Sequence, residues 1–125
     1  MRDIALSVRS YRELQVWHKG IELVTKVYGL TIKFPKSENY GLTSQIQRSA
    51  VSVPSNIAEG QARQHTGEFR QFLYVALGSL AELDTQIEIA KLLNYLSDDD
   101  WHSCQNQIIE LRKMLHGLIN KLPKK

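Results

Sequence analysis

The 125-residue sequence has one cysteine, three prolines and no long apolar run. A single cysteine, Cys104, cannot form an intrachain disulfide, so nothing indicates an oxidising compartment. No apolar stretch is long enough to span a bilayer, and residues 1–10 lack the continuous apolar region of a signal peptide. We therefore expect a cytoplasmic protein without a membrane anchor.

The motifs that mark metal centres, phosphate-binding loops and catalytic sites are also missing. The sequence has no HExxH, no cysteine pair with zinc spacing and no GxGxxG. Carboxylate-bridged metal bundles use Glu-x-x-His motifs, and Glu82, Asp84 and Glu88 have no histidine three residues later. Cys104 falls among apolar residues at helical spacing, which favours a small core residue over a nucleophile. We expect no catalytic activity, no metal and no cofactor.

Apolar residues recur at steps of three and four in four segments, which is typical of amphipathic helices. The prediction is an all-α, antiparallel up-down-up-down four-helix bundle over residues 11–122. Residues 1–10 would form an N-terminal arm, either frayed or extended, and residues 123–125 a basic tail. The predicted core stripes are Leu14, Trp17, Ile21, Val24 and Tyr28; Leu42, Ile46, Ala50, Val53, Ile57 and Gly60; Phe69, Leu73, Ala76, Leu80, Leu83, Ile87 and Ala90; and Trp101, Cys104, Ile108, Leu111, Leu115 and Leu118.

Pro54 interrupts the second helical pattern, where proline removes a backbone hydrogen bond. One interpretation is a single helix over about residues 39–64, kinked near Pro54. The other is a break, with a restart at Asn56 and Glu59. The apolar stripe stays in phase across Pro54, which favours the kinked helix.

More apolar residues are present than four core stripes can bury, which predicts a second buried surface. A symmetric homo-oligomer is the simplest way to cover it. The additional apolar residues are Val16, Leu23, Val27, Leu30, Tyr74, Leu77, Ile89, Leu92, Leu93, Ile109 and Ile119.

The net charge is +3, and part of the excess falls between residues 39 and 70. Residues 39–67 contain two basic residues, Arg48 and Arg63, and one acidic residue, Glu59. Arg70 follows in the third predicted helix. Arginines among neutral polar residues suit contacts with phosphates, which supply sequence-independent affinity for nucleic acids. A simple solvated surface is the alternative, because Glu59 and Arg63 also form a helical i,i+4 pair.

Six segments together resemble one family, the four-helix-bundle proteins encoded by intervening sequences in bacterial large-subunit ribosomal RNA genes. They are Tyr11–Trp17, Phe34–Lys36, Tyr40–Gln45, Ser52–Gly60, Phe72–Leu73 and Leu77–Leu83. The SNIAEG run in Ser52–Gly60 and the LGSLAE run in Leu77–Leu83 are specific in combination. The resemblance covers nearly the whole chain apart from residues 1–10.

The resemblance implies a homopentamer without enzymatic activity. The chain is also similar to the accessory variability determinant of diversity-generating retroelements, a basic pentamer that binds nucleic acid and a reverse transcriptase. This similarity makes Arg48, Arg63 and Arg70 the candidate nucleic-acid-binding residues. The family often has two adjacent basic residues where this chain has Gln47 and Arg48. The missing charge at Gln47 weakens the expectation that this chain binds nucleic acid.

The function expected from the sequence is that of a homo-oligomeric, pentameric accessory protein that binds RNA or an RNA–protein complex. Its partners would be further copies of itself, RNA or DNA, and a nucleic-acid-processing protein. The alternative is a structural or protein-binding oligomeric scaffold that does not bind nucleic acid.

Overall fold

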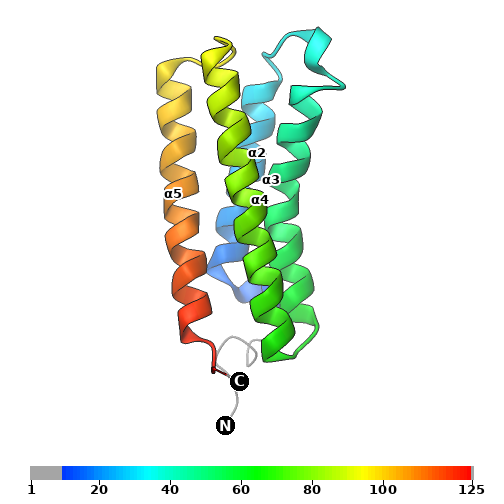
Figure 1. Cartoon of the computed structure of the whole chain (residues 1–125), viewed down its shortest axis with the longest axis vertical. Coiled ribbons are helices and arrows are strands. Elements are labelled where there is room, and N and C mark those ends of the chain that lie inside the picture. Colours follow the sequence, from blue (N-terminus) through cyan, green and yellow to red (C-terminus); the bar gives the residue numbers. More distant parts are fainter. Residues whose placement is uncertain (1–9, 125) are drawn as a thin grey trace.

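A computed structural model describes residues 10–124, which form four long helices and two short 3-10 turns (Figure 1). No strand occurs within these residues, so the prediction of an all-α four-helix bundle is confirmed. The predicted N-terminal arm falls on residues that, apart from Ser10, lie outside the described part. The elements are η1 (Tyr11–Glu13), α2 (Gln15–Thr31), η2 (Lys36–Glu38), α3 (Leu42–Ala62), α4 (Thr66–Leu92) and α5 (Asp98–Lys121).

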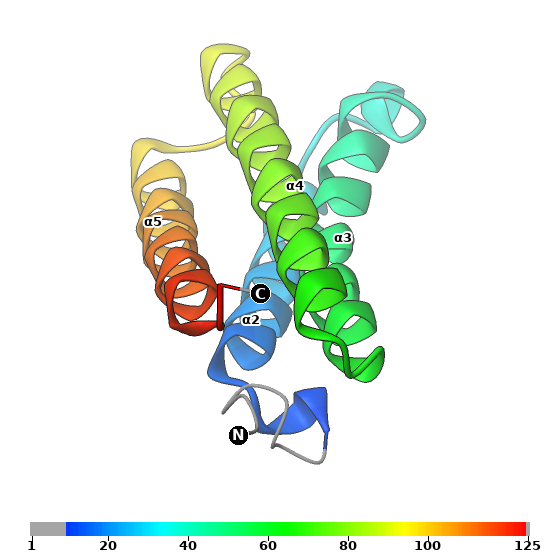
Figure 2. The ribbon, with the colours of Figure 1, turned by 60° about the horizontal axis from the view of Figure 1, so that its bottom comes forward.

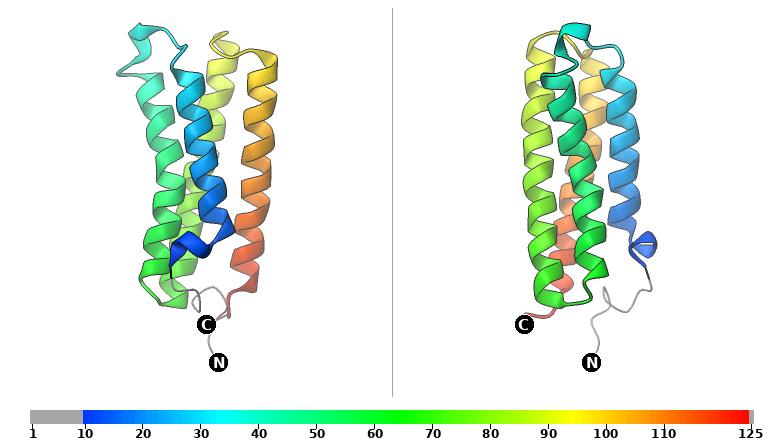
Figure 3. Two further views of the ribbon diagram at one scale, coloured as in Figure 1. Left: turned by 180° about the vertical axis from the view of Figure 1, so that it is seen from behind. Right: turned by 90° about the vertical axis from the view of Figure 1, so that its right-hand side faces the viewer.

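The four helices form a closed ring around one core. Helices α2 and α4 each contact both α3 and α5. Figure 3 shows consecutive helices running side by side in opposite directions, joined by short connections. Consequently the start of α2, the α3–α4 turn and the end of α5 lie at one end of the bundle, and the other two connections lie at the opposite end.

The predicted core faces of α3, α4 and α5 are largely those that the structure buries. Apolar side chains that repeat every three or four residues on these helices have no exposed surface, as expected for one apolar helix face packed against its neighbours. The residues of these helices with an exposed fraction of 0 % are Ile46, Ala50, Val53, Ile57, Phe69, Leu73, Ala76, Leu80, Leu83, Ile87, Ala90, Cys104, Ile108 and Leu115.

The predicted core face of α2 is wrong in part: Leu14 is buried and Trp17 and Val24 pack against the core, but Ile21 and Tyr28 are 38 % and 45 % exposed. The buried residues of α2 are Val16, Gly20, Leu23, Val27, Leu30 and Thr31, four of which are expected from the sequence to lie on a second buried surface. Both sets step by three and four, so periodicity alone could not separate them. The buried set contains Gly20, whose missing side chain lets α2 approach α3: a Cβ there would lie 3.1 Å from the Pro54 Cβ.

Helix α3 continues through Pro54 without a break, as the preferred interpretation predicted. It begins at Leu42 rather than near residue 39, because Lys36–Glu38 forms a 3-10 turn. Glu38 Oε1 accepts a hydrogen bond from the Leu42 amide at 3.1 Å and satisfies one of the free donors of the first turn. The kink at Pro54 stays a prediction.

Candidate nucleic-acid interface

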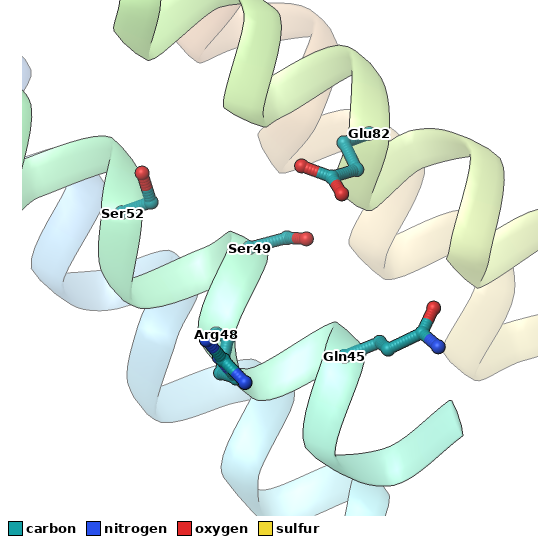
Figure 4. Close-up of a pocket in the computed structure, with 5 residues that line it drawn as sticks. All are labelled: Gln45, Arg48, Ser49, Ser52 and Glu82. Carbon is teal, nitrogen blue, oxygen red and sulfur yellow. The ribbon is translucent and has the colours of Figure 1, made fainter. Parts of the chain in front are cut away.

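Arg48 lines an open groove between α3 and α4 (Figure 4). Its lining includes the carboxylate of Glu82 on α4 as well as Gln45 and Ser49 on α3. Arg48 forms no ion pair within residues 10–124, and its side chain is exposed. The groove therefore carries charges of both signs, and an anion entering it would meet Glu82 as well as Arg48.

A polar network closes this groove on the side toward the α3–α4 turn. The hydroxyls of Ser52 on α3 and Ser79 on α4 lie 2.8 Å apart in a hydrogen bond between the helices. Asn56 donates to the Ser52 carbonyl at 2.7 Å and to its hydroxyl at 2.9 Å. These hydrogen bonds use polar atoms of Ser52, Asn56 and Ser79 near Pro54, so we assign these side chains a structural role.

Arg63 follows the last residue of α3 and binds two carboxylates. Its guanidinium lies 3.0 Å from Glu59 and 3.3 Å from Glu68, and it also stands 5.2 Å from the centroid of the Phe72 ring. The hydrogen bond with Glu59 is the main reason that the pKa of Arg63 is raised above its ordinary value. A phosphate at this guanidinium would have to compete with two carboxylates that already accept hydrogen bonds from it.

Arg70, in the second turn of α4, lies in a different environment. Its guanidinium donates a hydrogen bond to the main-chain carbonyl of Pro123, in the segment after α5. Together with Lys124 it lines a groove between α4 and α5, and none of the described residues that line this groove is acidic. Of the three predicted arginines, Arg70 is thus the one whose immediate surroundings favour an anion.

The three arginines do not form one patch. Arg48 precedes Arg63 by fifteen residues along α3, which corresponds to about 22 Å at the helical rise per residue. Arg63 and Arg70 both lie near the α3–α4 turn, but Arg63 binds carboxylates of α3 and α4, whereas Arg70 faces α5.

The two ends of the bundle differ in charge. The end that carries the α3–α4 turn, which Figure 2 brings forward, is called the basic end here. Its charged residues are Arg12, Arg63, Arg70, Lys121 and Lys124, with Glu13, Glu59 and Glu68. The opposite, acidic end carries Lys33, Lys36 and Lys91, with Glu38, Asp98, Asp99 and Asp100.

The 23S rRNA-intervening sequence protein family matches residues 12–117, which is most of the chain. The chain belongs to this family. Family membership confirms the resemblance found in the sequence. No curated protein matches the chain.

One solved structure of a family member from Bacteroides thetaiotaomicron, described as a protein of unknown function from the S23 ribosomal protein family, is similar to this fold. The TM-score is 0.77 at 24 % sequence identity, and the match covers 84 % of this chain and 95 % of that chain. At this identity the likeness supports the fold and carries no functional detail.

Several residues of the two grooves were not among those that the sequence indicated. Glu82, Gln45 and Ser49 join Arg48, and Asn120 and Lys124 join Arg70. The sequence could indicate only neighbours within one helix, because residues four apart share a helix face. Contacts between α4 and the segment after α5 join residues more than fifty positions apart, and no pattern in the sequence predicts them.

Nothing in the described part of this family member indicates a metal centre or a membrane span. Residues 10–124 contain no group of three or more histidine, cysteine or acidic residues placed to hold an ion. None of the helices there is both long enough and apolar enough to cross a bilayer.

Cys104 is a buried core residue with a weakly acidic thiol. It has no exposed surface, and burial raises its pKa to about 11 from the usual 9.0. A thiolate is the reactive form of cysteine, so this side chain is poorly suited to act as a nucleophile near neutral pH.

The raised pKa of Cys104 predicts a loss of stability at high pH. The folded state holds the thiol proton more tightly than the unfolded chain, so its stabilisation is complete below about pH 8 and is lost as pH rises toward 11. At pH 10.5 this loss should be about 2 kcal/mol. Between pH 8 and pH 10.5, the free energy of unfolding measured with urea should drop more for the natural protein than for Cys104→Ala. Equal drops would contradict the prediction.

Proposed function

We propose that this protein is a non-enzymatic, cytoplasmic homo-oligomer that binds nucleic acid, most readily RNA or an RNA–protein complex, as an accessory factor. The observation that carries the proposal is the groove at the basic end, in which Arg70 and Lys124 lie together and no residue of the described lining is acidic. Cations free of local acidic partners attract phosphates and release counterions on binding.

The three arginines of the proposed interface should contribute unequally. Arg70 has Lys124 beside it, whereas Arg63 is paired with Glu59 and Glu68, and Arg48 shares its groove with Glu82. Nearby carboxylates compete with a phosphate for the same guanidinium. We therefore expect Arg70 to contribute most of the affinity and the other two arginines to contribute less.

Two separate exposed apolar faces support self-association. The first lies along α2 and α3 and is called the α2–α3 face. The second is the outer surface of the C-terminal half of α4, called the α4 face. The α2–α3 face comprises Ile21, Tyr28 and Val51, with half-buried Trp17 and Val24, and the α4 face comprises Ile89, Leu92 and Leu93.

Two different apolar faces on one chain suit a head-to-tail contact, in which one face of a copy packs on the other face of the next copy. Such heterologous contacts form a ring when the rotation between successive copies closes, whereas a two-fold dimer would need only one face. A pentameric ring would gather five basic ends and multiply weak phosphate contacts through avidity. Binding that is weak for one chain would then become strong for the assembly.

Fluorescence anisotropy with labelled single-stranded RNA and duplex DNA, across a salt titration, tests the nucleic-acid proposal. Neutralising the groove with Arg70→Gln and Lys124→Gln should weaken binding about tenfold or more. It should also reduce the slope of affinity against salt by about one to two contacts, because two phosphate-binding cations are lost.

The matched control is Lys33→Gln with Lys36→Gln, which removes the same charge from the acidic end. It should leave binding within about twofold of the natural protein, since long-range attraction is screened beyond about 10 Å. Equal losses in both double variants would place the interface elsewhere. Absence of any binding at low salt would refute the nucleic-acid proposal.

The alternative function is an oligomeric scaffold that binds proteins only. The neutralisation of Arg63 by two carboxylates favours it, because a dedicated phosphate contact would leave that guanidinium unpaired. A stable oligomer that binds neither RNA nor DNA would support this function over the first.

A further inference from the structure

The groove between α4 and α5 at the basic end combines cationic, aromatic and amide side chains in a volume of about 270 Å³. This combination differs from the groove at Arg48, where polar residues of both charges lie together without an aromatic ring. It also differs from the groove between α2 and α5, which is mainly apolar. The α4–α5 groove is lined by Arg70, Tyr74, Ile119, Asn120, Leu122 and Lys124.

The cationic part of the groove is held in place by the main chain. The Arg70 guanidinium donates to the Pro123 carbonyl, which fixes the segment after α5 against α4 and brings Lys124 into the lining. A guanidinium has five N–H donors, so those not used by Pro123 remain for a ligand. Arg70 and Lys124 together present a positive wall to the groove.

Tyr74 supplies the aromatic part. It follows Arg70 by four residues on α4, so both side chains lie on the same helix face. Tyr74 is 53 % exposed, and it lines the groove together with the buried apolar residues Ile119 and Leu122, which are 6 % and 5 % exposed. A large exposed ring beside two cations is the arrangement by which proteins stack unpaired bases while binding the backbone.

Asn120 completes the lining from α5. Its exposed amide offers both donor and acceptor atoms, which suit a base edge or a sugar hydroxyl. The groove therefore matches the three parts of a nucleotide: a phosphate, a planar base and a polar sugar or base edge.

We propose that the α4–α5 groove binds a nucleotide of a single-stranded nucleic acid, with Arg70 and Lys124 on the phosphate, Tyr74 stacked on the base and Asn120 on a polar edge. This inference rests on the proposed nucleic-acid function and adds the form of ligand that the protein selects. Bases in a duplex are already stacked on one another, so Tyr74 distinguishes single strands from duplexes.

The test uses Tyr74→Leu, which keeps an exposed apolar side chain and removes the ring, and Tyr74→Phe as its matched control, which keeps the ring. The probes are labelled 12-nucleotide oligouridine, the corresponding oligothymidine and a 12-base-pair duplex. For single strands, Tyr74→Leu should lower the affinity about tenfold and Tyr74→Phe less than twofold. Neither variant should change duplex binding or the salt slope, because the cations are intact. Equal effects on the RNA and DNA strands would assign recognition to the base rather than to the sugar.

Three results would overturn the subsite. If Tyr74→Leu binds single strands like the natural protein while Arg70→Gln with Lys124→Gln does not, the proposed function stands and the stacking role fails. If Tyr74→Leu lowers the oligomer mass in light scattering, the ring lies at a subunit contact rather than in an open groove. If the natural protein binds none of the three probes, the proposed function fails and the subsite fails with it.

Discussion

Replacing Gly60 with alanine should lower the free energy of unfolding by about 2 kcal/mol or more, because a side chain there has no room. An added Cβ would lie 2.6 Å from the Phe72 Cβ and 3.1 Å from a ring carbon of Phe69. Phe69 is fully buried, so it cannot turn aside without disturbing the core. Helix α3 or α4 would have to shift, at a cost larger than the gain in helix propensity from alanine.

Gly78→Ala is the matched control for Gly60→Ala. Gly78 lies inside α4, and an added Cβ would meet nothing within 4 Å. Alanine should therefore raise the free energy of unfolding by up to about 1 kcal/mol through helix propensity alone. Urea denaturation followed by circular dichroism measures both variants. If the free energy of unfolding changes in the same direction in both variants, close packing at Gly60 does not control how closely α3 and α4 approach.

Placing two lysines on the α4 face should dissociate the proposed oligomer. Ile89 is 42 % exposed and Leu92 is 72 % exposed in a single chain, so both are available for contact with a neighbour. Burying two unpaired ammonium groups in an apolar contact costs several kcal/mol. In multi-angle light scattering at micromolar concentration, the natural protein should have a multiple of 14.3 kDa and Ile89→Lys with Leu92→Lys should have 14.3 kDa.

The control for the lysine variant is Asn106→Lys with His116→Lys, which adds the same charge at exposed positions of α5 outside both apolar faces. It should keep the mass of the natural assembly. A natural protein that is already monomeric would show that the exposed apolar faces serve some other contact. An oligomer that survives the Ile89 and Leu92 changes would place its contacts away from the α4 face.

The fold could be predicted from the sequence where one helix face is much more apolar than the rest. This holds for α3 and α5, and the core positions Ile57 and Ile108 were identified from spacing alone. Helix α2 is apolar around a wide arc, so its orientation depends on which face approaches α3. That choice is made by contact between Gly20 and Pro54, which are distant in sequence.

The candidate site was only partly predictable for a similar reason. The pairing of Arg63 with Glu59 follows from i,i+4 spacing, but its second ion pair, with Glu68, depends on the path of the α3–α4 turn. The position of Arg70 in a groove depends on where the chain goes after α5. Local spacing predicts which side chains share a helix face, and only the packed bundle determines which faces meet.

The antiparallel course of the helices has a practical consequence for how this protein is handled. The described chain begins at Ser10 and ends at Lys124, and both positions lie at the basic end. An affinity tag fused after Lys125 would begin two positions after Lys124 and would compete with a ligand for the α4–α5 groove. A fluorescent label placed at Ser37, an exposed residue of η2, would report binding from the far end without covering the groove.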